Sequence, residues 1–172
     1  MGELIRLYSQ IAVLRRGPQD VPASVLLLAA TVVGYFLVNF AIYAALPPLE
    51  GPWLPRLLLE VAFILSWYVV LLLVTKRPER ILQTTTAVFG FRALLSPIAV
   101  VSEWLALRYQ HDTFWQLPFS LIALVLLVWL IAANGHVVKA ALEWSGAASV
   151  ALVILQVLVE DLVVLSVFPV KS

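Results

Sequence analysis

The sequence predicts an all-α integral membrane protein: a bundle of five transmembrane helices with an N-terminal amphipathic helix at the membrane interface. Two observations lead to this fold class. Of the 172 residues, 63% are hydrophobic and 12% are charged, whereas soluble domains average about 45–50% apolar and about 25% charged residues. In addition, the apolar residues gather into five long stretches. A chain of this size cannot hide so much apolar surface in one core, so its surroundings must be lipid.

Each apolar stretch reaches the roughly 20 residues that a helix needs to cross a bilayer. The stretches cover residues 21–46, 54–75, 80–107, 115–140 and 146–168. Short segments with Pro, Gly and charged residues separate them, and such short connections predict antiparallel neighbours. The first stretch is longer than the apolar part of a signal peptide, roughly 7–15 residues, so we expect a retained span. Residues 1–172 are thus predicted to form a single membrane domain.

Residues 1–17 form a shorter predicted helix that cannot span the membrane. Apolar side chains recur at helical spacing on one face, and polar ones occupy the other: Leu4, Leu7, Tyr8, Ile11 and Leu14 against Glu3, Arg6, Gln10 and Arg15. This pattern is typical of a helix that lies on a membrane surface. We expect it on the cytoplasmic surface, either as a topogenic anchor or as a docking surface for a partner.

The distribution of Lys and Arg predicts the orientation. With a cytoplasmic N-terminus, seven of them lie on the cytoplasmic side (Arg6, Arg15, Arg16, Lys76, Arg77, Arg80 and Lys139) and three on the other (Arg56, Arg108 and Lys171). Cytoplasmic loops carry the excess of Lys and Arg. We therefore expect a multi-pass protein of the cell inner membrane, with the N-terminus cytoplasmic and the C-terminus outside.

Four ionisable residues inside the spans are the candidate site: Glu60, Arg92, Glu160 and Asp161. Charges in a membrane usually face the bundle interior and pair with one another. With a helix rise of about 1.5 Å per residue, these groups fall at similar depths on three spans. We hypothesise one buried network, in which a single Arg faces three carboxyl groups and at least one carboxyl is protonated. Such a network either holds helices together or forms an ion or proton pathway.

The chain lacks the signatures of the common catalytic and cofactor sites. It contains no H-E-x-x-H, G-x-S-x-G, P-loop or G-x-G-x-x-G pattern and no cysteine. His111 and Asp112 supply too few ligands for a metal site. Basic residues are not interleaved with aromatic ones, as single-strand nucleic-acid binders require. We expect no enzymatic activity, no cofactor, no bound metal and no nucleic-acid partner.

Three stretches resemble short multi-spanning proteins of proteobacteria that are grouped with the Yip family of Ypt-interacting membrane proteins. They are VLRRGPQDVPAS (13–24), RPERILQTTTAVFG (77–90) and NGHVVKAALEW (134–144). The resemblance implies a five-span protein with a cytoplasmic N-terminus and a membrane-organising or accessory role. It implies no catalytic residue.

Together these observations predict a non-enzymatic accessory or scaffolding subunit of a membrane assembly. Its expected partners are the lipid bilayer and other membrane subunits or further copies of the chain. The alternative is a small proton- or cation-coupled transporter or channel, in which Glu160 or Asp161 takes up and releases the proton.

Overall fold

A computed structural model describes residues 2–46, 52–112 and 114–168. These residues form α1 (Gly2–Ala12), η1 (Pro18–Asp20), α2 (Val25–Ala45), α3 (Trp53–Val74), η2 (Pro78–Arg80), α4 (Ile81–Arg108), α5 (Gln116–Leu142) and α6 (Gly146–Val167). Helices α2 to α6 are each long and apolar enough to cross a membrane. Over the described residues, the prediction of an all-helical protein with five helices long and apolar enough to span a membrane is therefore confirmed.

The first span begins at Val25 rather than at Val21, because two local caps precede it. The Ser24 hydroxyl accepts a hydrogen bond from Leu27 N (3.3 Å) and so caps α2. Asp20 instead accepts a bond from Gly17 N (3.1 Å), which closes the η1 turn. A side-chain oxygen at the N-cap satisfies one of the free N–H groups of the first helical turn, and this defines where the helix starts.

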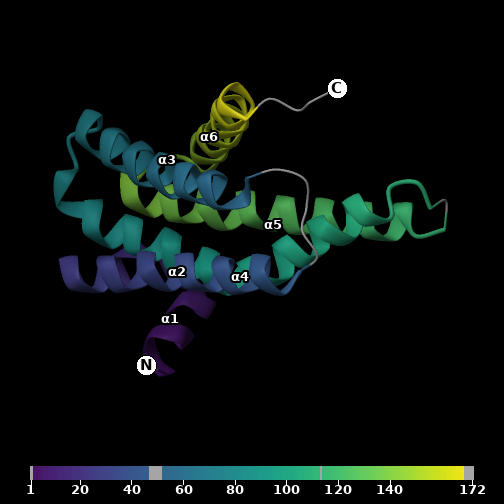
Figure 1. The fold of residues 1–172 in the computed structure, drawn as a ribbon. Helices are drawn as coiled ribbons and strands as arrows, with labels where there is room; N and C mark the ends of the chain where they lie inside the picture. The colour runs from purple at the N-terminus through teal and green to yellow at the C-terminus, as the bar shows by residue number, and fades with distance from the viewer. Residues whose placement is uncertain (1, 47–51, 113, 169–172) are drawn as a thin grey trace.

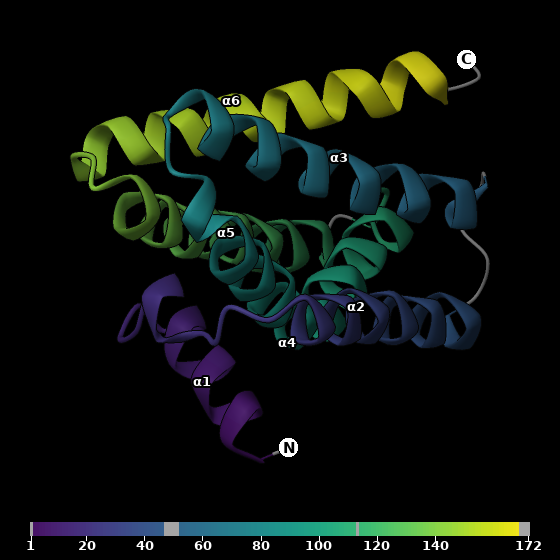
Figure 2. The same ribbon diagram turned by 90° about the vertical axis from the view of Figure 1, so that its left-hand side faces the viewer.

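The helix α4 lies at the centre of the bundle and contacts α1, α2, α3 and α5. Its residues 84–92 are buried without interruption. Figures 1 and 2 show that α6 does not lie antiparallel to α5. In Figure 1, α5 runs across the view and α6 is seen nearly end-on. In Figure 2, α6 runs across the view and α5 recedes from the viewer. The expectation that short connections make all neighbours antiparallel is wrong for this pair.

Two local features explain the steep crossing of α5 and α6. Glu143, which ends α5, has a left-handed backbone conformation (φ 59°), so the chain changes direction there. Where the helices cross, Gly135 lies under Val150, and a β-carbon on Gly135 would come within 3.0 Å of Val150 Cγ2. Small residues allow two helix backbones to approach closely inside a membrane. Gly135 therefore allows α6 to pack closely on α5.

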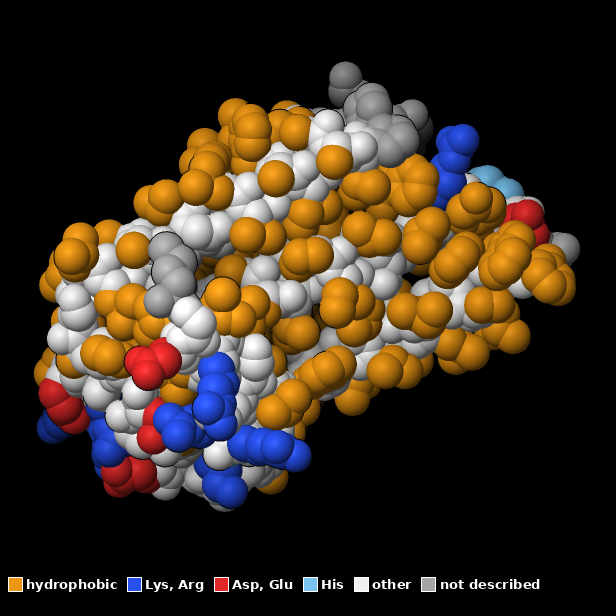
Figure 3. All heavy atoms as spheres, turned by 90° about the horizontal axis from the view of Figure 1, so that it is seen from below, with side chains coloured by type: hydrophobic (Ala, Val, Ile, Leu, Met, Phe, Trp, Pro, Cys, Tyr) orange, Lys and Arg blue, Asp and Glu red, His pale blue; other side chains and the backbone are white. Residues whose placement is uncertain are grey.

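The turn between α3 and α4 is tied to the end of α5 by ion pairs. Arg77 Nη1 and Arg80 Nη2 lie 2.9 Å and 2.8 Å from Glu143 Oε1. Hydrogen bonding to Arg77 lowers the pKa of Glu143 below its ordinary value. Figure 3 shows most of the charged side chains gathered at one end of the face that it presents, a smaller group at the opposite end, and apolar side chains between them. This distribution agrees with the count of basic residues; the orientation in the membrane stays a prediction.

At the opposite end, the hairpin of α4 and α5 protrudes beyond the other helices (Figure 1). Its tip carries aromatic pairs: the ring centroids of Tyr109 and Phe119 are 5.3 Å apart, and those of Trp115 and Phe119 are 5.4 Å apart. Asp112 closes the tip by accepting a hydrogen bond from Phe114 N (2.9 Å). Aromatic residues of this kind are enriched at membrane–water interfaces.

The N-terminal helix α1 packs on the side of the bundle. Its apolar residues Leu7, Tyr8, Ile11 and Ala12 are buried. The Tyr8 hydroxyl lies 2.9 Å from Thr31 Oγ1 of α2, and Trp129 Nε1 of α5 donates to the carbonyl of Ala12 (2.7 Å). The ring of Tyr8 covers Gly90 so closely that a β-carbon there would collide with it. The location of α1 at a membrane surface stays a prediction, but its contacts with the bundle are specific.

The contact between Tyr8 and Gly90 predicts how the protein responds to one added methyl group. We expect Gly90→Ala to lower the unfolding free energy by about 1–3 kcal/mol, the usual cost of overpacking. Gly34→Ala is the matched control, because nothing lies within 4 Å of a β-carbon there. Unfolding of both variants in mixed detergent micelles measures the difference. Equal stability of the two variants would show that α1 does not pack on Gly90.

Candidate functional site

The candidate site is a charge cluster around Arg92 of α4. The Arg92 side chain is buried, and its Nη1 lies 3.4 Å from Oε1 of Glu60 on α3 and 3.9 Å from Oε1 of Glu160 on α6. Arginine stays protonated in proteins, so its charge must be balanced by neighbours when it leaves water. One cation therefore links three helices.

A tyrosine adds the fourth helix to the cluster. Tyr35 of α2 donates a hydrogen bond from its hydroxyl to Glu60 Oε1 (2.5 Å). Its ring packs edge-on against Phe89 of α4, with centroids 5.4 Å apart. One turn further along α2, Asn39 donates to Ser96 Oγ of α4 (3.2 Å). The i, i+4 spacing of Tyr35 and Asn39 places both on the same side of α2, facing the same spacing of Arg92 and Ser96 on α4.

A further interhelical hydrogen bond extends the polar interior to α5. Tyr68 of α3 donates to Asn134 Oδ1 of α5 (3.2 Å), and both residues are completely buried. Hydrogen bonds between membrane helices contribute about 0.6 kcal/mol on average and up to about 1.7 kcal/mol each. Every one of the five long helices thus joins at least one polar or charged contact inside the bundle.

The same interior holds buried polar groups whose hydrogen bonding is incomplete. Gln156 of α6 is fully buried, and within the described residues neither of its amide atoms meets the full geometry of a hydrogen bond, although the Tyr68 hydroxyl lies close to the amide. Within the same residues, Nε of Arg92 has no hydrogen-bond partner. Gln156 precedes Glu160 by one helical turn, so the two side chains lie on the same side of α6. A buried polar group without a partner costs about 1–3 kcal/mol. This interior therefore offers donors and acceptors to a further polar group.

Asp161 is separate from this cluster. It is exposed on α6, and it makes no ion pair within the part of the chain that the structure describes. Adjacent residues of a helix point about 100° apart, so when Glu160 faces Arg92, Asp161 turns outward. On insertion scales an acid at the bilayer centre costs about 2.5–3.5 kcal/mol. Of the four predicted site residues, the structure brings together Glu60, Arg92 and Glu160 and leaves Asp161 on the outer face.

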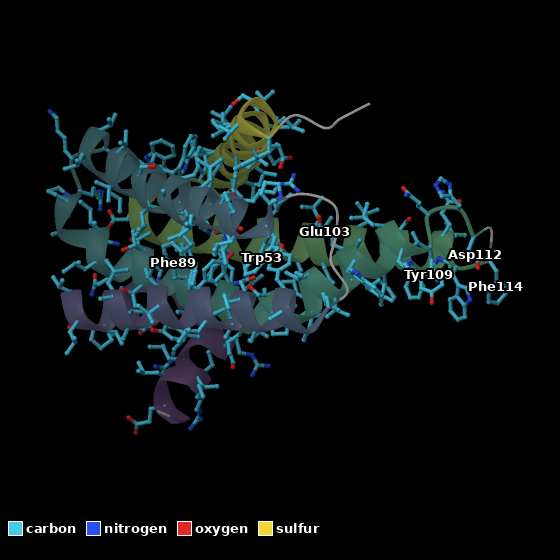
Figure 4. All side chains as sticks on the ribbon, in the orientation of Figure 1. Trp53, Phe89, Glu103, Tyr109, Asp112 and Phe114 are labelled. Atoms are coloured by element: carbon cyan, nitrogen blue, oxygen red, sulfur yellow. The ribbon has the colours of Figure 1, made fainter. Side chains whose placement is uncertain are left out.

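Glu103 of α4 is a charged residue that the sequence reasoning passed over. It lies close enough to Glu60, Asp161 and Arg56 for their charges to interact. Figure 4 shows it on the stretch of α4 between the bundle centre, marked by Phe89, and the protruding tip at Tyr109. A signal for it exists in the sequence: Glu103 follows Arg92 by 11 residues (103 − 92), which is about three helical turns. That spacing puts it on the same side of α4.

The groove on the outside of the bundle is unconnected with these charges. It has a volume of about 350 Å³, lies between α3 and α6, and is lined by apolar side chains that include Phe63, Trp67, Val70 and Leu152. No cluster of three or more potential metal ligands occurs in the described ranges. The arrangement around Arg92 is suited to holding helices together and to exchanging a proton among carboxyl groups.

Comparisons of the chain with known protein families, with curated proteins and with solved structures found no match. The resemblance to the Yip family therefore stays a prediction.

The cluster predicts a large effect of removing its only cation. We expect Arg92→Leu to lower the unfolding free energy by about 3–5 kcal/mol, because two carboxyl groups then share a buried site without a counter-charge. Arg108→Leu, at the exposed end of the same helix, should change it by less than about 0.5 kcal/mol. Expression level, folding and unfolding in micelles are the readouts. If Arg92→Leu leaves all three unchanged, the three residues do not form a network.

Proposed function

We propose that this protein is a non-enzymatic accessory or scaffolding subunit of a membrane assembly. One observation carries the proposal: the charges inside the bundle form contacts between helices. Arg92 is shared by Glu60 and Glu160, and Tyr35 adds α2 through Glu60. Polar groups used in this way specify which helices pack together. A protein whose buried chemistry serves its own packing is suited to a structural role.

The outer surface supports the same role. Large apolar side chains are exposed along α5 and α6, among them Leu117, Val125, Leu158 and Leu162. Such a surface can pack against lipid and against the helices of other subunits or of further copies. The charged end supports placement in the cell inner membrane with a cytoplasmic N-terminus. The resemblance to the Yip family points to a membrane-organising role as well.

A second candidate function is proton- or cation-coupled transport. The observation that favours it is the set of polar groups near Glu160 whose hydrogen bonding is incomplete, namely the amide of Gln156 and Nε of Arg92. Ionisable groups inside membrane bundles are typical of proton relays. Glu160, which faces these groups, is the residue that would carry the proton, whereas Asp161 on the outer face would not.

Isolation of the native assembly tests the accessory role. We expect the tagged protein, expressed at its native level and extracted in a gentle detergent, to migrate as a complex well above its own 19.0 kDa and to contain other subunits. Mass measurement and identification of the components provide the readout. Arg92→Leu should lower the yield of the complex, because it disturbs the packing of three helices. A species built of this chain alone would contradict the proposal.

Measurements of proton flux distinguish the accessory role from transport. The accessory role predicts that the purified protein in liposomes passes no more protons than liposomes without it. Transport predicts a proton flux that Glu160→Gln abolishes and Asp161→Asn retains, because Glu160 lies beside Arg92 and Asp161 does not. A flux with that pattern of loss would replace the accessory role by transport.

A further inference from the structure

The outward face of α6 combines large apolar side chains with one acid. Ile154, Leu158, Leu162 and Leu165 are exposed on this face, opposite to the buried Ser149, Val153 and Gln156. Asp161 lies among these apolar side chains and is exposed as well. Leu158, Asp161 and Leu165 follow the spacing of three and four residues that lines up side chains along one helix face. We call these five exposed residues the α6 outer face.

Asp161 is too deep in the span to reach water easily. It precedes the end of α6 by six residues (167 − 161), which is about 9 Å along the helix. Lys and Arg can extend long side chains from such a position to the membrane surface, but an Asp side chain is short. A carboxylate in that place is unfavourable in lipid alone, so it calls for a cationic or hydrogen-bonding partner on the outside of the bundle.

Among the residues that the structure describes, no Lys or Arg forms an ion pair with Asp161. Arg92 is engaged by Glu60 and Glu160 inside the bundle. Arg56, on the exposed side of α3, lies within electrostatic range of Glu103. The other Lys and Arg residues that the structure describes lie in α1 and the segment after it, in the turn before α4, near the end of α5, or at Arg108 at the tip of the hairpin. Within the described residues, the exposed basic group that a second copy could bring near this depth is Arg56, and the charge of that side chain already interacts with Glu103.

We infer that the α6 outer face binds a transmembrane helix of a different protein, and that this helix carries a Lys or Arg side chain opposite Asp161. The apolar residues of the face pack against the partner helix, and the carboxylate neutralises its cation. Each charge thereby offsets the cost of placing the other in the membrane, so binding depends on both charges. The inference rests on the proposed accessory function and names the chemistry of the partner.

A designed helix tests the charge pairing directly. The full-length chain, which has no cysteine, takes a single fluorophore at Gln110→Cys and is placed in liposomes. The probes are two synthetic Leu/Ala transmembrane helices, one with a Lys at the depth of Asp161 and one with Leu there. We expect the Lys helix to bind at least tenfold more tightly, measured by energy transfer, and Asp161→Asn to abolish the preference. Asp112→Asn, a carboxylate outside the α6 outer face, is the matched control and should retain it.

The result that would overturn the inference is equal binding of the two helices, or a preference for Lys that persists in Asp161→Asn. A photoreactive residue at Leu162 in the native membrane then distinguishes this failure from failure of the proposed function. Cross-linking to a chain with a basic residue in its span supports the inference, while cross-linking to lipid or to a second copy contradicts it. If other subunits co-purify equally with the wild-type chain and with Asp161→Asn, the accessory role stands and the α6 outer face is not where they bind.

Discussion

The charge on Arg92 is the constraint around which the bundle is arranged. A guanidinium group remains protonated in proteins, so its burial inside the bundle requires counter-charges from neighbouring helices. Glu60 and Glu160 provide them from α3 and α6, and Tyr35 stabilises Glu60 from α2. The relative position of four helices follows from balancing one positive charge. A bundle without Arg92 would have no electrostatic reason to bring the acids of α3 and α6 to the same point.

This constraint also explains the unusual character of α4. It is the least apolar of the five candidate spans and the most deeply buried, and it carries both Arg92 and a row of threonines, Thr84 to Thr86. A helix of this kind cannot face lipid, so the other elements cover it. The helix α1 completes the cover, because Gly90 leaves room for Tyr8 directly against the backbone of α4. An element outside the set of spanning helices thus contributes to the shielding of the polar interior.

The two adjacent acids of α6 point to different sides of the helix, one into the bundle and one to its outer surface. Glu160 contacts Arg92, whereas Asp161 faces outward among leucines. The inward acid contacts the buried cation of the bundle, and the outward one carries the charge for which we propose a partner helix. This division fits an accessory subunit better than a self-sufficient transporter, in which both acids would be expected to face a common pathway.

The sequence alone determined the class of the protein, the five candidate spans and the presence of ionisable groups inside them, because length and composition are local properties that need no knowledge of neighbours. It also placed Glu60, Arg92 and Glu160 at similar depths through the helix rise. The tertiary structure decided the rest: that α6 crosses α5 steeply over Gly135, that α1 packs on Gly90, that Asp161 turns away from Arg92, and that Glu103 lies near Glu60. The rotation and crossing angle of a helix depend on the shape of the surface it packs against, and residues distant in the sequence create that surface. The length and composition of a span limit where it can lie, but only its neighbours select which of its residues face inward.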